Sequence, residues 1–464
     1  MSLAELLAEH PFGDDEELLH SIDRSLTAGA ARAEAADVAA RLREAGIEPG
    51  QPVAVALGDA IDTVVAMFGV WIAGGVLVPL NPRAPSRERV GLLDAIAPAA
   101  VLDDTGLHRQ EGARALPDDS AFVLWTSGTT GRPKPVLHTH AAYVELLDRV
   151  LGSLASRAER REMPNIVPVS LALNAGIYNV LFALRSGAGV VVMDRFDPQT
   201  FATLVRRFAI RSAVLPPAAM TMLCDDERVD DLSPLRYVRS ITAPLSPVQA
   251  RRFAGAFGVT VLNGYGQAEI GEVIGWTGAD AREHPDKIGA VGRPHSNVDV
   301  RIVRDDGRVA DDGEVGELHV RLPKMAAGYA DGSSIDDRID ADGFLRTGDL
   351  ARVDPDGFVW IEGRVGDVIN RGGNKVFPGH VEEVLRLSPR VDDAAVVGVP
   401  DDRLGEIPVA FVVGDASDDE LVALCRDHLV AYKVPAAFHR VDSLPRNEVG
   451  KVMRSALVAR AGVP

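Results

Sequence analysis

The sequence predicts an α/β protein with a large N-terminal domain and a small C-terminal α+β domain. Three observations support this prediction: the chain has 464 residues, short apolar runs alternate with helical segments, and Asp-Gly turns become frequent only late in the chain. The length exceeds one compact core, because domains usually contain about 100–200 residues. Alternating strands and helices favour mostly parallel sheets with helices on their faces.

The first part of the chain carries this alternation. Val38, Leu42 and Ile47 recur at helical spacing, and Gly46 stands where a helix stop is expected. The other predicted elements share either a short apolar run or helical periodicity. They are helices at 35–46, 201–208 and 247–257 and strands at 53–57, 190–193, 213–215 and 259–262.

The longest uncharged apolar stretch, 64–80, is too short for a membrane span, which needs roughly 18–20 residues. Gly74, Gly75 and Pro79 also interrupt it, so we expect a buried helix followed by a buried strand. The N-terminus, 1–23, is acidic and lacks a cationic start followed by an apolar run, so it is not typical of a signal peptide.

The pattern changes after residue 299 to short strands separated by Asp-Gly turns, which predict a meander or a small β-barrel-like part. The glycine-rich, charged stretch 363–373 is interpreted as a linker. We therefore place an N-terminal domain at 1–363 and a C-terminal domain at 364–464. The elements expected in the second domain are helices at 381–387 and 419–429 and strands at 394–398 and 409–413.

Charge and cysteine content limit the function classes. The formal net charge of -18 disfavours nucleic acid and anionic membrane surfaces as partners, so any phosphate ligand must be bound locally. The chain has only two cysteines, Cys224 and Cys425, which are far apart and lack metal-ligand spacing. We expect neither a disulfide framework nor a structural zinc, and a reducing cytoplasm is consistent with this.

The densest motif is 126–134, which directly follows the apolar run 121–125. Its small residues let backbone N–H groups converge on an anion, hydroxyls add donors, and Lys134 adds charge. It is not a Walker loop, because the lysine does not directly follow the second glycine. A flexible linker is the alternative interpretation. The expected phosphate-binding residues are Thr126, Ser127, Gly128, Thr129, Thr130, Gly131 and Lys134.

This loop resembles the signature loop of adenylate-forming enzymes, which include acyl-CoA synthetases, nonribosomal peptide adenylation domains and beetle luciferases. Pro135 stands where the family generally has glycine. Four further stretches are similar to motifs of this family, in the same order. They are 265–269, 346–349, 363–367 and 445–451, and the residues of the last one resemble those of acyl-CoA synthetases. The resemblance implies an acid-activating enzyme that uses ATP, Mg²⁺ and coenzyme A.

The resemblance also implies residue roles. Tyr265 would lie against adenine, and Asp349 would accept hydrogen bonds from the ribose hydroxyls. Glu269 would be catalytic as an oxygen ligand of Mg²⁺. Taken alone, Glu269 and Arg364 would be interpreted as surface charges, whose ion pairs contribute little. The residues implied against the nucleotide are Gly264, Tyr265, Gly266, Gln267, Asp349 and Arg364.

In the C-terminal domain, the resemblance makes Lys451 catalytic, since it would reach the α-phosphate and the carboxylate and stabilise the charge that develops there. The domain would then rotate about the hinge Gly366 and bring Gly372 and Gly373 to the site, where coenzyme A would pass. Without the resemblance, Lys451 would be a solubilising residue and the two glycines would only form a turn.

The sequence departs from the family pattern at several positions. Ala268 replaces the usual threonine, which removes a hydroxyl contact worth about 1.5–3 kcal/mol if nothing substitutes. Gly366 replaces the usual aspartate or lysine. The stretch 168–176 has no histidine, and Asn174 disfavours an amino-acid substrate because an amide cannot neutralise an ammonium group. The expected acyl-pocket residues are Asn174, Tyr178, Ala243 and Pro244.

The favoured hypothesis is an AMP-forming acid–thiol ligase. A carboxylic acid and ATP would give acyl-AMP and pyrophosphate, and coenzyme A would then displace AMP. One alternative is an adenylating enzyme that loads the phosphopantetheine of a carrier protein. Another is a protein that binds an acyl-adenylate or nucleotide without efficient adenylation. We expect an apolar alkyl, aryl or polycyclic acid, because 171–182 and 214–220 are mostly uncharged.

Overall fold

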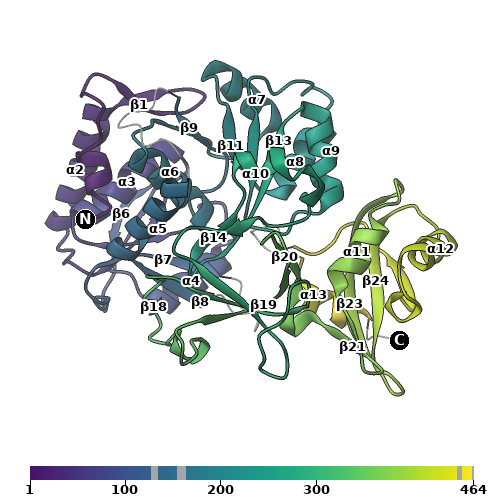
Figure 1. The fold of residues 1–464 in the computed structure, drawn as a ribbon. Coiled ribbons are helices and arrows are strands. Elements are labelled where there is room, and N and C mark those ends of the chain that lie inside the picture. Colours follow the sequence, from purple (N-terminus) through teal and green to yellow (C-terminus); the bar gives the residue numbers. More distant parts are fainter. Residues whose placement is uncertain (127–133, 154–162, 447–451, 462–464) are drawn as a thin grey trace.

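The computed structural model describes residues 1–126, 134–153, 163–446 and 452–461. It has two large mixed sheets and a four-stranded sheet in the N-terminal domain, and a five-stranded sheet in the C-terminal domain. The predicted α/β fold class with a large and a small domain is confirmed. In Figure 1 the C-terminal domain, in light green and yellow, lies beside β19 (Leu345–Val353) and β20 (Val359–Arg364).

The first large sheet has the strand order β18-β8-β7-β4-β3-β5-β6. Its central strands β7, β4, β3 and β5 are parallel, and the flanking strands are antiparallel. Every residue of β3 is buried, as expected for a parallel strand that is covered on both faces. The strands are β3 (Pro52–Ala56), β4 (Val76–Pro79), β5 (Ala100–Asp103), β6 (Gly106–Arg109), β7 (Ser120–Thr126), β8 (Lys134–Thr139) and β18 (Gly328–Tyr329).

The second large sheet has the order β15-β14-β13-β12-β11-β9-β10-β1-β2. Strands from β13 to β1 run parallel, and β2, β14 and β15 are antiparallel. The strand predicted at 259–262 continues to residue 267, into the motif 265–269. The strands are β1 (Glu17–His20), β2 (Ser25–Thr27), β9 (Asn165–Val167), β10 (Val190–Val192), β11 (Ser212–Leu215), β12 (Tyr237–Ser240), β13 (Thr260–Gln267), β14 (Gly271–Gly275) and β15 (Arg293–Pro294).

The helices of the N-terminal domain cover these sheets (Figure 1). The helix predicted at 35–46 begins earlier, at Ala28, where the Thr27 side chain accepts a hydrogen bond from the Ala30 backbone N–H as an N-cap. The helices are α1 (Glu5–Ala8), α2 (Ala28–Glu44), α3 (Ala60–Ile72), α4 (Ser86–Ile96), α5 (His140–Ser153), α6 (Asn174–Arg185), α7 (Pro198–Arg207), α8 (Pro217–Asp225), α9 (Pro247–Phe257) and α10 (Gly278–Glu283).

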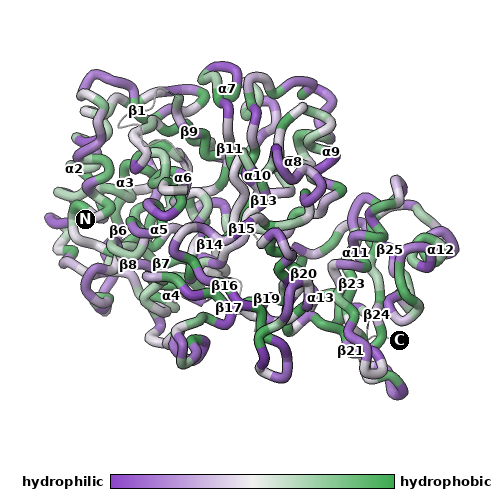
Figure 2. The backbone as a smooth tube through the Cα atoms, in the orientation of Figure 1, coloured by the Kyte–Doolittle hydropathy of each residue, from purple (hydrophilic) through white to green (hydrophobic). Residues whose placement is uncertain are grey.

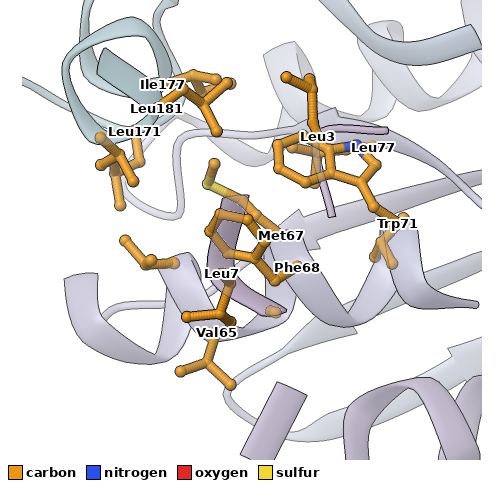
Figure 3. Packing of buried hydrophobic residues seen from close by; sticks show 14 of the residues in the cluster. Leu3, Leu7, Val65, Met67, Phe68, Trp71, Leu77, Leu171, Ile177 and Leu181 are labelled. Carbon is orange, nitrogen blue, oxygen red and sulfur yellow. The ribbon is translucent and has the colours of Figure 1, made fainter. Parts of the chain in front are cut away.

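The stretch 64–80 forms the buried helix α3 and the buried strand β4, as predicted. Figure 3 shows Met67, Phe68 and Trp71 of α3 within the hydrophobic core. The indole N–H of Trp71 donates a 2.7 Å hydrogen bond to the carbonyl oxygen of Ala121, which anchors α3 to β7. Within the described ranges, no helix is both long and apolar enough to cross a membrane.

The four-stranded sheet has the order β16-β17-β19-β20 and is an open antiparallel meander, with β16 and β20 unpaired to each other among the described residues. The structure therefore takes the meander form rather than a closed barrel. Its Asp-Gly turns have the predicted geometry, with φ of 81° at Gly307 and 82° at Gly343. The remaining bounds are β16 (Asp299–Val303) and β17 (Gly316–Arg321).

The C-terminal domain has the sheet order β22-β21-β24-β23, with β25 beside β24. The linker predicted at 363–373 is only partly correct, because Arg364 ends β20 and Ile369 already begins β21. In Figure 2 the central strands of this domain are largely green and its outer loops purple. The elements are β21 (Ile369–Arg371), β22 (Asn374–Val376), α11 (Pro378–Leu385), β23 (Val391–Asp401), β24 (Gly405–Gly414), α12 (Asp418–His428), β25 (Ala437–Arg440) and α13 (Arg454–Ala461).

Candidate functional site

The motif 265–269 lies at the end of β13, where the chain turns back into β14. The pairing of the two strands shifts by one residue between Tyr265 and Gly266. A Cβ atom at Gly266 would lie 2.0 Å from the carbonyl oxygen of Gly271, so only glycine fits this close approach. The tight hairpin turns the chain directly after the motif.

Asp349 on β19 is the acceptor on which this motif converges. Its Oδ2 accepts a 2.6 Å hydrogen bond from the Tyr265 hydroxyl and a 2.7 Å bond from Gln267 Nε2. Its Oδ1 lies 3.0 Å from Nε of Arg364. The Asp349 side chain is 7% exposed, and a buried carboxylate requires such partners. The structure therefore brings together four residues that the sequence placed against the ribose and adenine.

The Tyr265 hydroxyl is a donor to Asp349 in this structure. Burial and the neighbouring Asp349 carboxylate raise the pKa of Tyr265 well above its usual value, so the phenol stays protonated. Gln267 Nε2 also donates a 2.9 Å hydrogen bond to the Thr347 carbonyl oxygen, which ties β13 to β19.

Glu269 is buried, and the guanidinium group of Arg338 lies beside it. Arg338 Nη1 lies 2.8 Å from Glu269 Oε1, and the Tyr329 hydroxyl donates a 3.1 Å hydrogen bond to the same oxygen. Arg338 Nη2 donates a 3.0 Å bond to Gln267 Oε1, so Arg338 links the two motif residues. Arg338 and Tyr329 come from short segments without a recognisable motif, and the sequence analysis missed both.

The predicted phosphate loop, 126–134, connects β7 and β8, which pair as an antiparallel hairpin up to Thr126 and Lys134. Residues 127–133, with most of the expected phosphate ligands, lie outside the described residues. Lys134 Nζ lies 5.2 Å from the centroid of the Tyr329 ring, a cation–π contact. Tyr329 therefore joins the end of the phosphate loop to Glu269.

His138 lies beneath this site and was not anticipated. It is 2% exposed and stacks on Phe122 with ring centroids 4.9 Å apart. Burial lowers the pKa of His138 to about 4, although the Glu269 carboxylate opposes this shift. His138 is therefore neutral near neutral pH, and the local charge is set by Glu269 and Arg338.

The arrangement around Glu269 suits a magnesium ion that also binds a triphosphate. Among the described residues no three His, Cys, Asp or Glu side chains gather as a metal site. Mg²⁺ usually takes one or two carboxylates together with substrate phosphates and water. The hydrogen bonds and the ion pair described above all involve Oε1, which makes the second oxygen of Glu269 the expected ligand atom.

The structure describes only some of the residues in the C-terminal motifs. Lys451 lies outside the described residues, but the flanking Arg446 and Val452 pair as an antiparallel bridge. Arg454, which begins α13, lies 3.4 Å from Asp367 through its Nε atom. A Cβ atom at Gly366 would meet nothing within 4 Å, so packing does not require glycine at the expected hinge.

Gly372 and Gly373 form the two-residue turn between β21 and β22. Their φ angles are 56° and 85°, as a hairpin turn with two left-handed residues requires. The turn alone explains both glycines, so their role toward coenzyme A remains a prediction.

The expected acyl-pocket residues occupy two different environments. Asn174 begins α6, and its Oδ1 accepts a 2.7 Å hydrogen bond from the Tyr143 hydroxyl. Tyr178, one turn later, is 8% exposed. Ala243 is half-buried and Pro244 is exposed, in the segment between β12 and α9.

Tyr178 belongs to a hydrophobic core cluster, and a buried group of charged residues lies near it. Arg239 Nη1 on β12 lies 2.5 Å from Glu272 Oε1 on β14, and His295 Nε2 lies 3.0 Å from the same oxygen. Despite burial, Arg239 and His295 lower the pKa of Glu272 to about 2. The uncharged stretch around Tyr178 gave no sign of these groups, because they come from other strands.

Comparison with known proteins identifies the family of this chain. The family model described as AMP-binding enzyme matches residues 8–116 and 105–330, and the model for the AMP-binding enzyme C-terminal domain matches 380–451. A coenzyme A ligase of Mycobacterium tuberculosis, named for a methyl-dioxo-octahydro-indenyl propanoyl group, is 33% identical over 96% of this chain and 95% of its own.

Two further similarities cover the chain almost completely. A sulfoacetate–CoA ligase of Cupriavidus necator is 31% identical over 94% of this chain and 93% of its own. The solved structure of the amide bond synthetase McbA from Marinactinospora thermotolerans is 28% identical, covers 99% of both chains and superposes with a TM-score of 0.86.

Proposed function

Because this chain belongs to the family of AMP-binding enzymes, we propose that it activates a carboxylic acid with ATP and transfers the acyl group to the thiol of coenzyme A. In the first step a carboxylate oxygen attacks the α-phosphorus, and the bond to pyrophosphate breaks. In the second step the thiol sulfur attacks the acyl carbon, the thiol proton is lost, and AMP leaves. The observation that carries this proposal is the continuous network from Asp349 through Gln267, Arg338 and Glu269 to Tyr329.

In this proposal Asp349 binds the ribose. A carboxylate has about four acceptor positions, and the structure fills three of them with Tyr265, Gln267 and Arg364. One ribose hydroxyl can therefore bond to Asp349 without breaking the network, and a second would replace one of the three donors. The three fixed donors hold the carboxylate in one orientation, which reduces the cost of ordering it when the nucleotide binds.

Glu269 and Arg338 act on the triphosphate. Mg²⁺, when bound, would neutralise phosphate charge that opposes attack by the acid anion. Arg338 Nη1 fixes one oxygen of Glu269 at 2.8 Å, so the carboxylate does not need to reorganise when charge develops. We assign Lys451 to the α-phosphate in the same step, on the strength of its motif.

The acceptor is the second part of the proposal. The two named relatives are ligases for coenzyme A, whereas the solved neighbour is named an amide bond synthetase. We place Gly372 and Gly373 against the pantetheine arm, since both lie in a tight turn that presents its backbone. Loading of a carrier protein and transfer to an amine are the competing acceptor reactions.

A pyrophosphate-release screen tests the proposal. Purified protein is incubated with ATP, Mg²⁺ and a panel of carboxylic acids, with and without coenzyme A, a carrier protein bearing phosphopantetheine, or a simple amine. We expect acid-dependent pyrophosphate and, only with coenzyme A, a thioester detected by mass spectrometry. Asp349→Asn should strongly reduce both. Pyrophosphate with no thioester but with amide or carrier product would contradict the assigned acceptor, and no pyrophosphate with any acid would contradict adenylation.

A further inference from the structure

Arg149 on α5 is a buried cation with unused hydrogen-bond donors. Its side chain is 1% exposed. Within the described part of the chain, its Nε and Nη1 have no hydrogen-bond partner. Among the residues that the structure describes, Nη2 alone has acceptors near it, the carbonyl oxygen of Ile270 at 3.5 Å and Glu145 Oε2 at 3.7 Å. Burying unpaired donors of a charged group costs free energy, so such a group usually has a partner.

The nearby carboxylates do not provide that partner. Glu272 is already bound by Arg239 at 2.5 Å and by His295 at 3.0 Å. Glu145 lies one helical turn before Arg149 and remains beyond hydrogen-bond distance. Burial lowers the pKa of Arg149, because the charges of Glu145, Tyr178 and Glu272 compensate it incompletely.

The position of Arg149 is next to the expected acyl pocket. Tyr143, on the same helix α5, donates a 2.7 Å hydrogen bond to Oδ1 of Asn174, one of the expected pocket residues. The Glu272 carboxylate carbon would lie 3.5 Å from a Cβ atom at Gly264, which places this cluster against the adenine motif.

We propose that Arg149 binds a second acidic group of the substrate, so that the acid activated by this site is a dicarboxylic acid. This inference rests on the proposed function. One carboxylate of the acid is adenylated, and the other accepts hydrogen bonds from Arg149. The dicarboxylic class replaces the apolar acid that the sequence predicted.

An anionic group suits this site better than a neutral one. Arg239 is paired with Glu272 at 2.5 Å, whereas Glu145 Oε2 lies 3.7 Å from Arg149 Nη2, beyond hydrogen-bond distance. A substrate carboxylate at hydrogen-bond distance would form charge-assisted bonds, which are roughly twice as strong as neutral ones. It would also satisfy donors that otherwise remain buried without a partner.

Matched acids test the inference. The probes are the dicarboxylates from glutarate to suberate, the monocarboxylates with the same carbon numbers, and 5-oxohexanoate as a neutral acceptor. For each acid we measure kcat/KM for pyrophosphate release and the thermal shift of the protein with a non-hydrolysable ATP analogue. The variants are Arg149→Met, Arg149→Lys and the control Arg185→Met, which removes a neighbouring arginine that already pairs with Asp148 at 2.8 Å.

We expect the parent protein to favour a dicarboxylate over its matched monocarboxylate by about tenfold or more, as one charge-assisted bond implies. Arg149→Met should remove most of this preference, measured as the ratio of kcat/KM between matched acids. Arg149→Lys should retain part of the preference, and Arg185→Met should leave it unchanged. A general folding defect would lower all acids equally, whereas the ratio between matched acids reports the contact.

Each outcome separates the inference from the proposed function. Pyrophosphate release with monocarboxylates or 5-oxohexanoate, at a ratio that Arg149→Met does not alter, would overturn the inference and leave the ligase proposal intact. No release with any acid, together with a dicarboxylate-dependent thermal shift that Arg149→Met abolishes, would support the inference and contradict adenylation. Neither release nor thermal shift with dicarboxylates would overturn the inference. If Arg149→Met fails to fold, an unchanged ratio in Arg149→Lys would overturn it.

Discussion

Replacing Glu269 by glutamine separates its charge from its shape. The amide oxygen can still accept the bonds from Arg338 and Tyr329, so the network keeps its geometry. A charge-assisted bond contributes about 1.5–3 kcal/mol and a neutral one about 0.5–1.5, so unfolding free energy should fall by roughly 1 kcal/mol. Arg338 is 29% exposed and can be solvated, which keeps this loss small.

The effect on magnesium should be larger than the effect on stability. Loss of the anionic ligand should raise the Mg²⁺ concentration at half-maximal pyrophosphate release by roughly tenfold, equivalent to about 1.4 kcal/mol. The matched control is Asp354→Asn, a carboxylate of similar burial that pairs with Lys287 at 2.9 Å outside the site. It should lose similar stability with no change in the Mg²⁺ titration. An unchanged titration in Glu269→Gln would refute the assignment of the ligand.

Three further predictions concern neighbouring positions. Ala268→Thr should raise the adenylation rate if the missing hydroxyl limits it, and initial rates of pyrophosphate release measure this. An unchanged or lower rate would mean that the site compensates elsewhere. Gly366→Pro should impair one half-reaction more than the other, because it fixes φ at the expected hinge, and a melting curve checks that the variant folds; equal effects would place the hinge elsewhere. His138→Gln should reduce the loss of unfolding free energy at acid pH. With a folded pKa of about 4 against 6.5 unfolded, His138 takes up its proton more readily when unfolded, so stability falls as pH drops from about 6.5 to 4. The variant should lose about 3 kcal/mol less than the parent over that window, and identical pH slopes in denaturant titrations would contradict the assignment.

Sequence patterns were sufficient where local chemistry decides the outcome. The helix at 247–257 matches α9 residue for residue, because Ser246 caps its start and Gly258 with φ of 65° ends it. Asp349, Tyr265 and Gln267 could be placed together only through their motifs, since β13 and β19 belong to different sheets.

Other features depend on contacts between segments that carry no pattern of their own. Arg338 lies in a short 3₁₀ turn far along the chain from Glu269, and nothing near it in the sequence indicates that it pairs with that carboxylate. The charged groups around Tyr178 come from α5, β12 and β14, each of which contributes an otherwise ordinary helix or strand residue. The uncharged local sequence therefore gives no indication that these charged groups lie near Tyr178.

The proposed ligase reaction is tested most directly by Lys451→Ala in two assays. The first measures pyrophosphate release from acid and ATP, and the second measures AMP release from a synthetic acyl-adenylate and coenzyme A. Because a preorganised cation is worth about 10²–10³ in rate, the first reaction should be nearly abolished. The second should be spared, since a rotated domain no longer presents Lys451. Comparable losses in both reactions, or no loss in the first, would contradict the account.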